Sequence, residues 1–424
     1  MVGPPPKQLI WMAVFLFLRA FEEGSFVDVF GFFLKLLIIL VAARAAAEVF
    51  AYPRLPAVLG EVSVGVLIGP SLLNVVQVEP VFYLLAEIGI LLLLFEVGMD
   101  TDVAQLAKTG GESSFVAVTG VIAPTALIFW ASRYWLTLPF LASLFTAGAF
   151  VATSIGITVR VLADLKMERT RFARVVLGAA VLDDVIGVVI LAMLINYSRV
   201  NAVEWLPGLK GLVFILIFLV AAPVITKLFI PHIAAAAEKS KSKGTLPGAA
   251  IALILALALA AELVGAPAII GAFVAGIALS RKFCLSFGPY SCGLGNNLSE
   301  RIEASTKPII DLFVPVFFVV VGISINFKAI DFSNGRFWLI AAILTPLAMI
   351  GKAISGVWAK GGFRTKALTG ISMIPRGEVG LVFAQAGKTS GAFDDAIYAA
   401  VVFTVALTTL AAPLLLKAVA RKDR

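Results

Sequence analysis

The chain has 424 residues, of which 60% are hydrophobic and 14% are charged. Soluble domains are about 45–50% apolar, so this composition argues against a soluble enzyme and indicates a polytopic membrane protein. The net charge of +8 does not require a nucleic-acid partner, because basic residues at cytoplasmic helix ends give the same excess. Cys284 and Cys292 are the only cysteines and lie in one loop, which supports neither a disulfide framework nor a zinc site.

The first 28 residues form a separate N-terminal segment. Residues 1–6 read Met-Val-Gly-Pro-Pro-Pro and cannot be helical. Residues 8–20 are apolar but too few to cross a bilayer comfortably, since a spanning helix needs about 20 residues. We therefore predict a short or surface-lying helix in segment 1–28.

Apolar runs of membrane-spanning length recur along the rest of the chain, separated by short loops that carry proline, glycine or charge. We predict an all-α polytopic membrane protein with thirteen transmembrane helices. The predicted spans are 29–51, 55–72, 80–98, 112–134, 141–163, 173–198, 209–232, 245–264, 267–281, 303–325, 335–359, 365–388 and 392–417.

Basic residues indicate the orientation of these helices. Most of them fall in the loops on the side reached at the end of the first span, and that side also receives the C-terminus. Because positive residues gather on the cytoplasmic side, we expect the C-terminus to be cytoplasmic. The expected location is the bacterial inner membrane or an equivalent energised membrane. Basic residues on that side are Arg54, Lys108, Lys166, Arg169, Arg171, Arg174, Lys239, Lys241, Lys243, Arg281, Lys282, Arg301, Lys307, Lys360, Arg364, Lys366, Lys417, Arg421, Lys422 and Arg424.

A short sequence similarity between two parts of the chain indicates two repeats. The second span begins Pro56-Ala57-Val58-Leu59-Gly60 with Gly65 five residues on, and the ninth begins Pro267-Ala268-Ile269-Ile270-Gly271 with Gly276 five residues on. One linker helix between two six-helix halves inverts the second half, and transporters of this design bind their substrate near the midplane. The predicted units are a first repeat at 29–198, a linker helix and cytoplasmic loop at 199–244, and a second repeat at 245–424.

Asp183 and Asp184 lie midway along the sixth predicted span. Ionisable residues at that depth are costly and mark a functional site by default. Adjacent helical residues point about 100° apart, so the two acids cannot face one partner equally.

One span in each half is expected to be interrupted, as in other inverted-repeat transporters. In the fifth span, Thr153 and Ser154 offer hydroxyl oxygens; in the twelfth, Pro375 and Gly377 break the helical hydrogen-bonding pattern. We favour Thr153 and Ser154 as ligands of a monovalent cation, although back-bonding to their own helix is the alternative.

Further charges lie inside apolar runs. Lys352 needs an acidic partner, for which Asp183 and Asp184 are the candidates, unless it reaches the cytoplasmic surface instead. We expect Arg376 and Glu378 to neutralise helix ends or to pair with each other. Four other acids are read as packing or funnel residues: Glu61, Glu87, Glu96 and Glu262.

The chain resembles the monovalent cation/proton antiporter-two family, in particular its NapA-type Na⁺/H⁺ branch. The resemblance begins at about residue 40 and covers nearly all of the remaining chain. It is carried by the stretches 54–61 with 69–71, 87–89 and 95–100, 182–185, 271–276, 315–322 and Pro375-Arg376-Gly377-Glu378.

The resemblance implies an NhaA-like fold with crossed, interrupted helices, and it gives the site residues separate roles. Asp184 would bind the cation or a proton, with Thr153 and Ser154 as further ligands of the transported Na⁺. Asp183 would form a salt bridge with Lys352, and this pair would make the exchange electrogenic. The resemblance also implies a homodimer with a moving core of about 112–198 and 335–420 and a scaffold formed by the remainder.

The expected function is secondary active Na⁺/H⁺ antiport by alternating access, serving pH homeostasis, with no cofactor and no enzymatic activity. Na⁺ and protons would compete for Asp184, and membrane lipids would surround the protein. K⁺/H⁺ exchange is the alternative within the family, and Li⁺ is a further candidate ion. A cation channel, which needs no countertransport, is the alternative of a different class.

Overall fold

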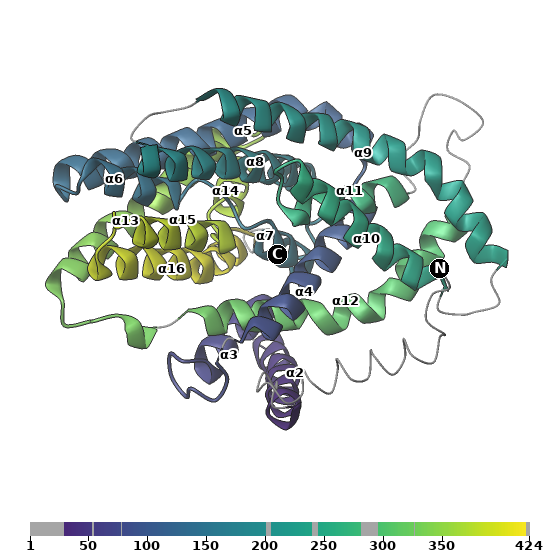
Figure 1. The fold of residues 1–424 in the computed structure, drawn as a ribbon, viewed down its shortest axis with the longest axis horizontal. Helices are drawn as coiled ribbons and strands as arrows, with labels where there is room; N and C mark the ends of the chain where they lie inside the picture. Colours follow the sequence, from purple (N-terminus) through teal and green to yellow (C-terminus); the bar gives the residue numbers. More distant parts are fainter. Residues whose placement is uncertain are drawn as a thin grey trace, which may run out of the picture.

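The computed structural model describes residues 29–52, 55–77, 79–200, 205–239, 245–280, 296–325 and 327–420, and every extended regular element within these ranges is a helix (Figure 1). Segment 1–28 and the loop cysteines Cys284 and Cys292 lie outside the described residues. The main helices are α2 (Val29–Ala51), α3 (Ala57–Ile68), α4 (Pro80–Asp100), α5 (Val103–Trp130), α6 (Phe140–Gly148), α7 (Ile155–Asp164), α8 (Arg171–Val200), α9 (Trp205–Lys239), α10 (Thr245–Leu263), α11 (Ala268–Leu279), α12 (Asn296–Ser324), α13 (Gly335–Ser355), α14 (Phe363–Ser372), α15 (Glu378–Thr389) and α16 (Asp395–Ala420).

Nine helices in the described ranges are long and apolar enough to cross a membrane. The predicted spans 55–72 and 267–281 differ, because α3 and α11 have only 12 residues each. A helix of that length rises about 18 Å, less than the roughly 30 Å thickness of the hydrocarbon layer. Each begins directly after a proline, Pro56 or Pro267, and each ends where Gly69 or Ser280 adopts an extended backbone.

Two predicted spans are interrupted near their middles, as the sequence analysis expected. The predicted span 141–163 consists of α6 and α7, separated at residues 149–154. The predicted span 365–388 consists of α14 and α15, separated at residues 373–377. Pro375 has no backbone N–H to donate, which accounts for the second interruption.

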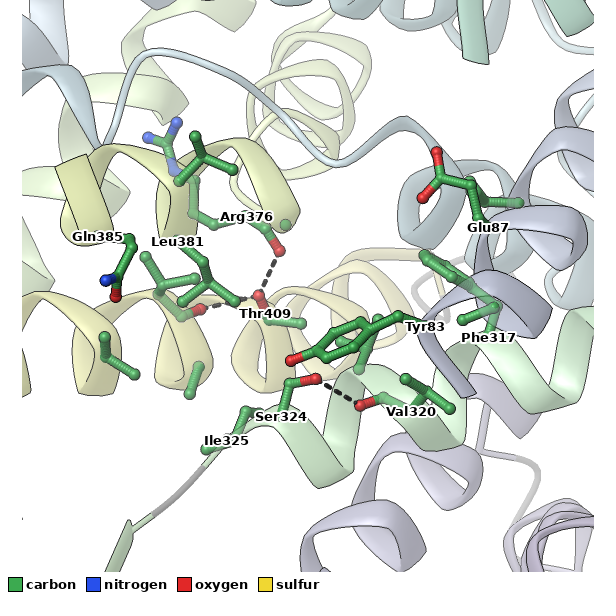
Figure 2. A pocket seen from close by; sticks show the side chains of 18 of the residues that line it. Tyr83, Glu87, Phe317, Val320, Ser324, Ile325, Arg376, Leu381, Gln385 and Thr409 are labelled. Carbon is green, nitrogen blue, oxygen red and sulfur yellow. Dashed lines mark hydrogen bonds between the residues drawn. The ribbon is translucent and has the colours of Figure 1, made fainter. Parts of the chain in front are cut away.

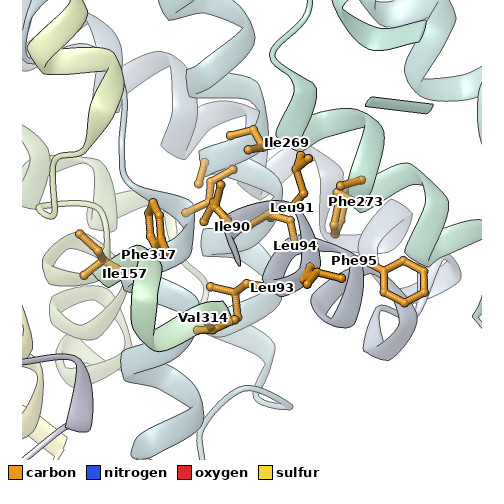
Figure 3. Packing of buried hydrophobic residues seen from close by; sticks show 14 of the residues in the cluster. Ile90, Leu91, Leu93, Leu94, Phe95, Ile157, Ile269, Phe273, Val314 and Phe317 are labelled. Carbon is orange, nitrogen blue, oxygen red and sulfur yellow. The ribbon is translucent and has the colours of Figure 1, made fainter. Parts of the chain in front are cut away.

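The helices form two groups that meet around α7 (Figure 1). One group contains α5, α6, α8 and α13–α16, with a buried cluster that includes Phe145, Leu344 and Val401. The other group contains α2–α4 and α9–α12. Its packing centres on α4, where Ile90 and Phe95 lie among buried side chains of α11 and α12 (Figure 3).

Close helix contacts in the second group depend on glycine. A Cβ atom on Gly65 of α3 would lie 2.1 Å from the carbonyl oxygen of Val319 on α12, and the facing residue is Gly322. A Cβ atom on Gly276 of α11 would lie 2.1 Å from the carbonyl oxygen of Phe95 on α4, and the facing residue is Gly98. Small residues let membrane helices approach closely, which is how packing stabilises them where lipid replaces water.

The two glycine motifs of the sequence make matching contacts. A Cβ atom on Gly60 would lie 2.6 Å from the carbonyl oxygen of Ala46, which brings α3 against α2. A Cβ atom on Gly271 would lie 2.1 Å from the carbonyl oxygen of Leu257, which brings α11 against α10. The helix pairs α2–α3 and α10–α11 therefore pack through equivalent glycines.

Candidate cation site at two interrupted helices

Asp183 and Asp184 lie near the middle of α8, a helix of 30 residues. Their relative exposures are 0% and 2%, so both acids are removed from solvent. A charge at that depth needs partners, because an isolated ion in a low-dielectric interior is strongly destabilising. The contacts around Asp183 supply them.

Lys352 and Thr153 both donate to one oxygen of Asp183. The Lys352 Nζ atom donates to Asp183 Oδ2, and the Thr153 hydroxyl donates to the same oxygen at 2.8 Å. Asp183 Oδ1 has no hydrogen-bond partner among the described residues. Lys352 also interacts electrostatically with Asp184.

Lys352 reaches this position from α13. Its side chain is 0% exposed, so it does not extend to the membrane surface as the alternative interpretation allowed. Gly120 of α5 lies opposite, where a Cβ atom would sit 3.4 Å from Lys352 Nζ. The lysine therefore occupies space that a larger residue at position 120 would compete for.

The two interruptions contact each other through their backbones. The Ser154 N–H donates to the Pro375 carbonyl at 2.9 Å, and the Thr153 hydroxyl lies 3.1 Å from the Met373 carbonyl. A Cβ atom on Gly377 would lie 2.9 Å from Ser154 Oγ, so glycine is the residue that allows this approach. Breaking a helix frees carbonyl oxygens from intrahelical bonding, and such oxygens are suitable ligands for a monovalent cation.

Thr153 does not bond back to its own helix, because its two acceptors are on α8 and in the second interruption. A hydroxyl has only one hydrogen, so it satisfies one acceptor fully at a time. Ser154 is the N-cap residue of α7, but its side chain makes no capping hydrogen bond. The structure therefore places Thr153 beside Asp183 of α8 and Ser154 beside Pro375 and Gly377 of the second interruption.

Arg376 connects the second interruption to the first. Its Nη1 atom donates to the Ala152 carbonyl at 2.7 Å, and its guanidinium lies 5.6 Å from the centroid of the Phe150 ring. The side chain is 1% exposed, and its Nε and Nη2 atoms have no hydrogen-bond partner in the described ranges. The backbone of Glu378 begins α15, whereas its side chain lies outside the described residues.

A cavity of about 400 Å³ lies between the two helix groups, next to the second interruption. Figure 2 shows Glu87 and Tyr83 on one side of it and Arg376, Leu381 and Gln385 on the other. The Arg376 carbonyl accepts a hydrogen bond from Thr409 at 2.6 Å. Glu87 was predicted as a packing or funnel residue, and here it lines this cavity.

A second cavity, of about 430 Å³, lies near the C-terminal ends of α4 and α7. The first cavity lies at the N-terminal half of α4. Its walls carry both signs of charge, including Glu96, Asp100, Arg169 and Lys307. Lys307 Nζ lies 2.6 Å from Glu96 Oε1, and Arg169 lies 4.0 Å from Asp100. By the basic-residue pattern of the sequence, this cavity belongs to the predicted cytoplasmic end.

Sequence reasoning missed several residues that the fold brings to these places. Thr409 gave no signal because a threonine in an apolar helix usually bonds to its own backbone. Arg160 inside the fifth span and Asp164 directly after it were overlooked, although charges four residues apart at the end of an apolar run are a usable signal. Both contact α3, as described below.

The profile of the family described as "sodium/hydrogen exchanger, transmembrane" matches residues 36–422. The chain belongs to this family. Its members are monovalent cation/proton antiporters. The sequence motifs predicted such an antiporter, and the family match confirms that prediction. Its curated relatives include Na⁺/H⁺ antiporters, which are transporters rather than enzymes.

Two relatives match nearly the whole chain. The high-affinity Na⁺/H⁺ antiporter NhaS3 of Synechocystis is 31% identical over 431 residues, covering 92% of this chain and 90% of the relative. The Na⁺/H⁺-K⁺ antiporter GerN of Bacillus cereus is 32% identical over 398 residues, covering 92% of this chain and 96% of the relative.

The fold also matches a solved structure. The sodium proton antiporter MjNhaP1 of Methanocaldococcus jannaschii superimposes with a TM-score of 0.64 at 15% sequence identity. The match covers 92% of this chain and 99% of the other. At that identity the comparison establishes the shared fold, and the roles of individual residues depend on the geometry above.

Proposed function

We propose that this chain is a secondary active Na⁺/H⁺ antiporter of the NapA type in which Na⁺ and protons compete for Asp184. The observation that carries the proposal is the buried ion pair of Lys352 and Asp183 directly beside Asp184, at the contact of two interrupted helices. One carboxylate is already neutralised by a lysine. We propose that the adjacent carboxylate, Asp184, carries the exchangeable charges.

Asp184, Thr153 and Ser154 form the proposed ligand set for the transported Na⁺, together with carbonyl oxygens freed at the interruptions. Hard monovalent cations prefer oxygen ligands, and a carboxylate supplies the compensating charge. Because a protonated carboxyl cannot also hold the cation, each loading of the site carries one species. That exclusion couples the two fluxes.

Asp183 and Lys352 determine the charge carried in each cycle. When Na⁺ binds at Asp184, the added positive charge weakens the hold of the acids on Lys352, which then releases its proton. The site thus carries different net charge in its Na⁺-loaded and proton-loaded forms. We infer from this difference that exchange is electrogenic.

Alternating access is proposed to occur by movement of a core, residues 112–198 and 335–420, against a scaffold made of the remainder. The cavities on either side of the α4–α7 contact support this division, since both lie between the two helix groups. Equivalent glycine contacts in α2–α3 and α10–α11 support two inverted repeats. We further propose that two copies of the chain form a homodimer through their scaffolds.

Proton flux in proteoliposomes tests the site. Asp184→Asn removes the exchangeable charge and nearly preserves the shape of the side chain, so cation-dependent proton movement should disappear. Asp331→Asn, at an exposed acid in the α12–α13 connection, is the matched control and should exchange normally. Exchange that survives Asp184→Asn would refute the site.

The same assay distinguishes the alternatives. GerN is named as a Na⁺/H⁺-K⁺ antiporter, so K⁺ and Li⁺ are tested beside Na⁺. Proton movement driven by K⁺ but not by Na⁺ would show that K⁺, and not Na⁺, is the transported cation. Cation flux without any proton movement would indicate a channel and would overturn the antiporter proposal.

A further inference from the structure

Asp164, the last residue of α7, caps the N-terminus of α3. Its Oδ2 atom accepts a hydrogen bond from the Ala57 N–H at 2.8 Å. The N-cap residue of α3 is Pro56, which has no side-chain oxygen and makes no capping bond. A carboxylate at a helix N-terminus also interacts favourably with the helix dipole. The cap of α3 therefore comes from a different element, α7.

A second contact joins the same two helices one turn further on. Arg160 of α7 lies 3.7 Å from Glu61 of α3, and it lies 3.8 Å from Asp164. The Glu61 side chain is 2% exposed, and its Oε2 atom has no hydrogen-bond partner among the described residues. Arg160 is thus the basic group nearest to an acid that is almost completely buried.

Helix α7 runs from the candidate cation site to α3. The helix starts at the candidate cation site, where the preceding residue Ser154 bonds to Pro375 of the second interruption. It ends on α3, which packs on α12 and α2 through Gly65 and Gly60. In the proposed division α7 belongs to the core and α3 to the scaffold, so one short helix connects the cation site to the scaffold.

We propose that Asp164, Arg160, Glu61 and the N-terminus of α3 form a latch that holds the core against the scaffold and must open in every transport cycle. The proposal rests on the proposed function, because it needs the core to move. Hydrogen bonds are directional and short-ranged, and an ion pair weakens with distance, so a displacement of a few ångströms along α3 separates Asp164 from the Ala57 N–H and weakens the pairing of Arg160 with Glu61. The latch would therefore hold the arrangement described here and contribute to the barrier between conformations.

A reversible disulfide tests whether the latch opens. Ala57→Cys and Asp164→Cys place one thiol on each of the two residues that the hydrogen bond between the Ala57 N–H and the Asp164 carboxylate now joins. The background carries Cys284→Ser and Cys292→Ser, so these are the only thiols. Oxidation in proteoliposomes should lower the Na⁺-driven proton flux at least about tenfold, because a tether blocks a step required in each turnover. A reductant should restore it.

The control is a pair of thiols within the scaffold. Ser280, directly after α11, donates a hydrogen bond at 3.2 Å to the carbonyl of Thr101, directly after α4, so Thr101→Cys with Ser280→Cys joins two scaffold elements through short side chains. Oxidation of this pair should leave the flux unchanged, since neither element moves relative to the other.

Each outcome of this experiment decides the inference. The inference is supported if oxidation lowers the flux in the latch pair but not in the control pair, and if a reductant restores that flux. Flux of more than half the reduced value in fully oxidised latch protein overturns it, and so does failure of the latch thiols to oxidise where the control thiols do. If the wild-type chain exchanges no cation, the proposed function fails instead, so the two failures are distinguishable.

Discussion

Lys352 donates to the same oxygen of Asp183 that accepts the Thr153 hydroxyl, and the side chains of both charged residues are 0% exposed. The pair joins α13 to α8 within the helix group that contains α5, α6, α8 and α13–α16. Asp184, the next residue on α8, is also buried. The electrostatic environment of the candidate site is thus fixed by residues from three separate elements, and several measurable consequences follow.

Removing one member of the Asp183–Lys352 pair should destabilise the protein more than removing both. Lys352→Met or Asp183→Asn leaves an uncompensated buried charge, which costs about 3–5 kcal/mol. The double variant removes both charges of the pair and should recover most of that loss. Thermal unfolding in detergent measures the difference; a double variant destabilised by the sum of the two single effects would show that the two residues do not stabilise each other.

The pair should also determine whether exchange responds to voltage. With Lys352→Ala the site no longer carries the lysine proton, so the charge moved per cycle changes and voltage dependence should fall. Exchange in proteoliposomes is compared at zero and at imposed membrane potential. If wild-type exchange is itself insensitive to voltage, the electrogenic role of Lys352 is wrong, even if Asp184→Asn abolishes the flux.

Competition at Asp184 predicts a specific pH dependence. As the pH falls, protons occupy a growing share of the site, so the apparent KM for Na⁺ should rise. Where the carboxyl is mostly protonated, the rise should be about tenfold per pH unit by simple linkage. The maximal rate at saturating Na⁺ should change less. An apparent KM that stays constant as the rate falls would contradict competition for one site.

Thr153 allows a test with two closely related substitutions. Thr153→Ser keeps the hydroxyl that lies near Asp183 and Met373, whereas Thr153→Val keeps the shape and removes it. Val should raise the apparent KM for Na⁺ and lower stability by about 1–3 kcal/mol, since a buried acceptor loses its donor. Ser should stay near wild type. Equal effects of Ser and Val would assign Thr153 a packing role through its methyl group.

Glycine contacts of the second helix group predict opposite results for one substitution at two positions. At Gly276 an added Cβ would lie 2.1 Å from the carbonyl oxygen of Phe95, whereas at Gly110 of α5 nothing lies within 4 Å. Gly276→Ala should cost about 1–3 kcal/mol by overpacking. Gly110→Ala should be neutral or stabilise by up to about 1 kcal/mol, the difference in helix propensity. Thermal unfolding of the two variants checks both signs.

The sequence by itself determined the helical membrane class, the approximate spans and the interrupted positions. Hydropathy and glycine or proline spacing are local properties, so they can be read without a fold. Pro375 marks an interruption wherever it lies in space, because the missing N–H belongs to the residue itself. Asp183, Asp184 and Lys352 were recognisable for a similar reason, since a charge in an apolar run is costly in any arrangement.

Only the tertiary structure decided how these residues meet. It placed Lys352 against Asp183, with both side chains fully buried, and the Met373 carbonyl beside Thr153. It brought Asp164 to the N-terminus of α3, where it caps Ala57, a residue 107 positions earlier in the chain. It also formed cavities between the helix groups. Hydrogen bonds depend on distance and direction between atoms, and these are set by helix packing rather than by the order of residues.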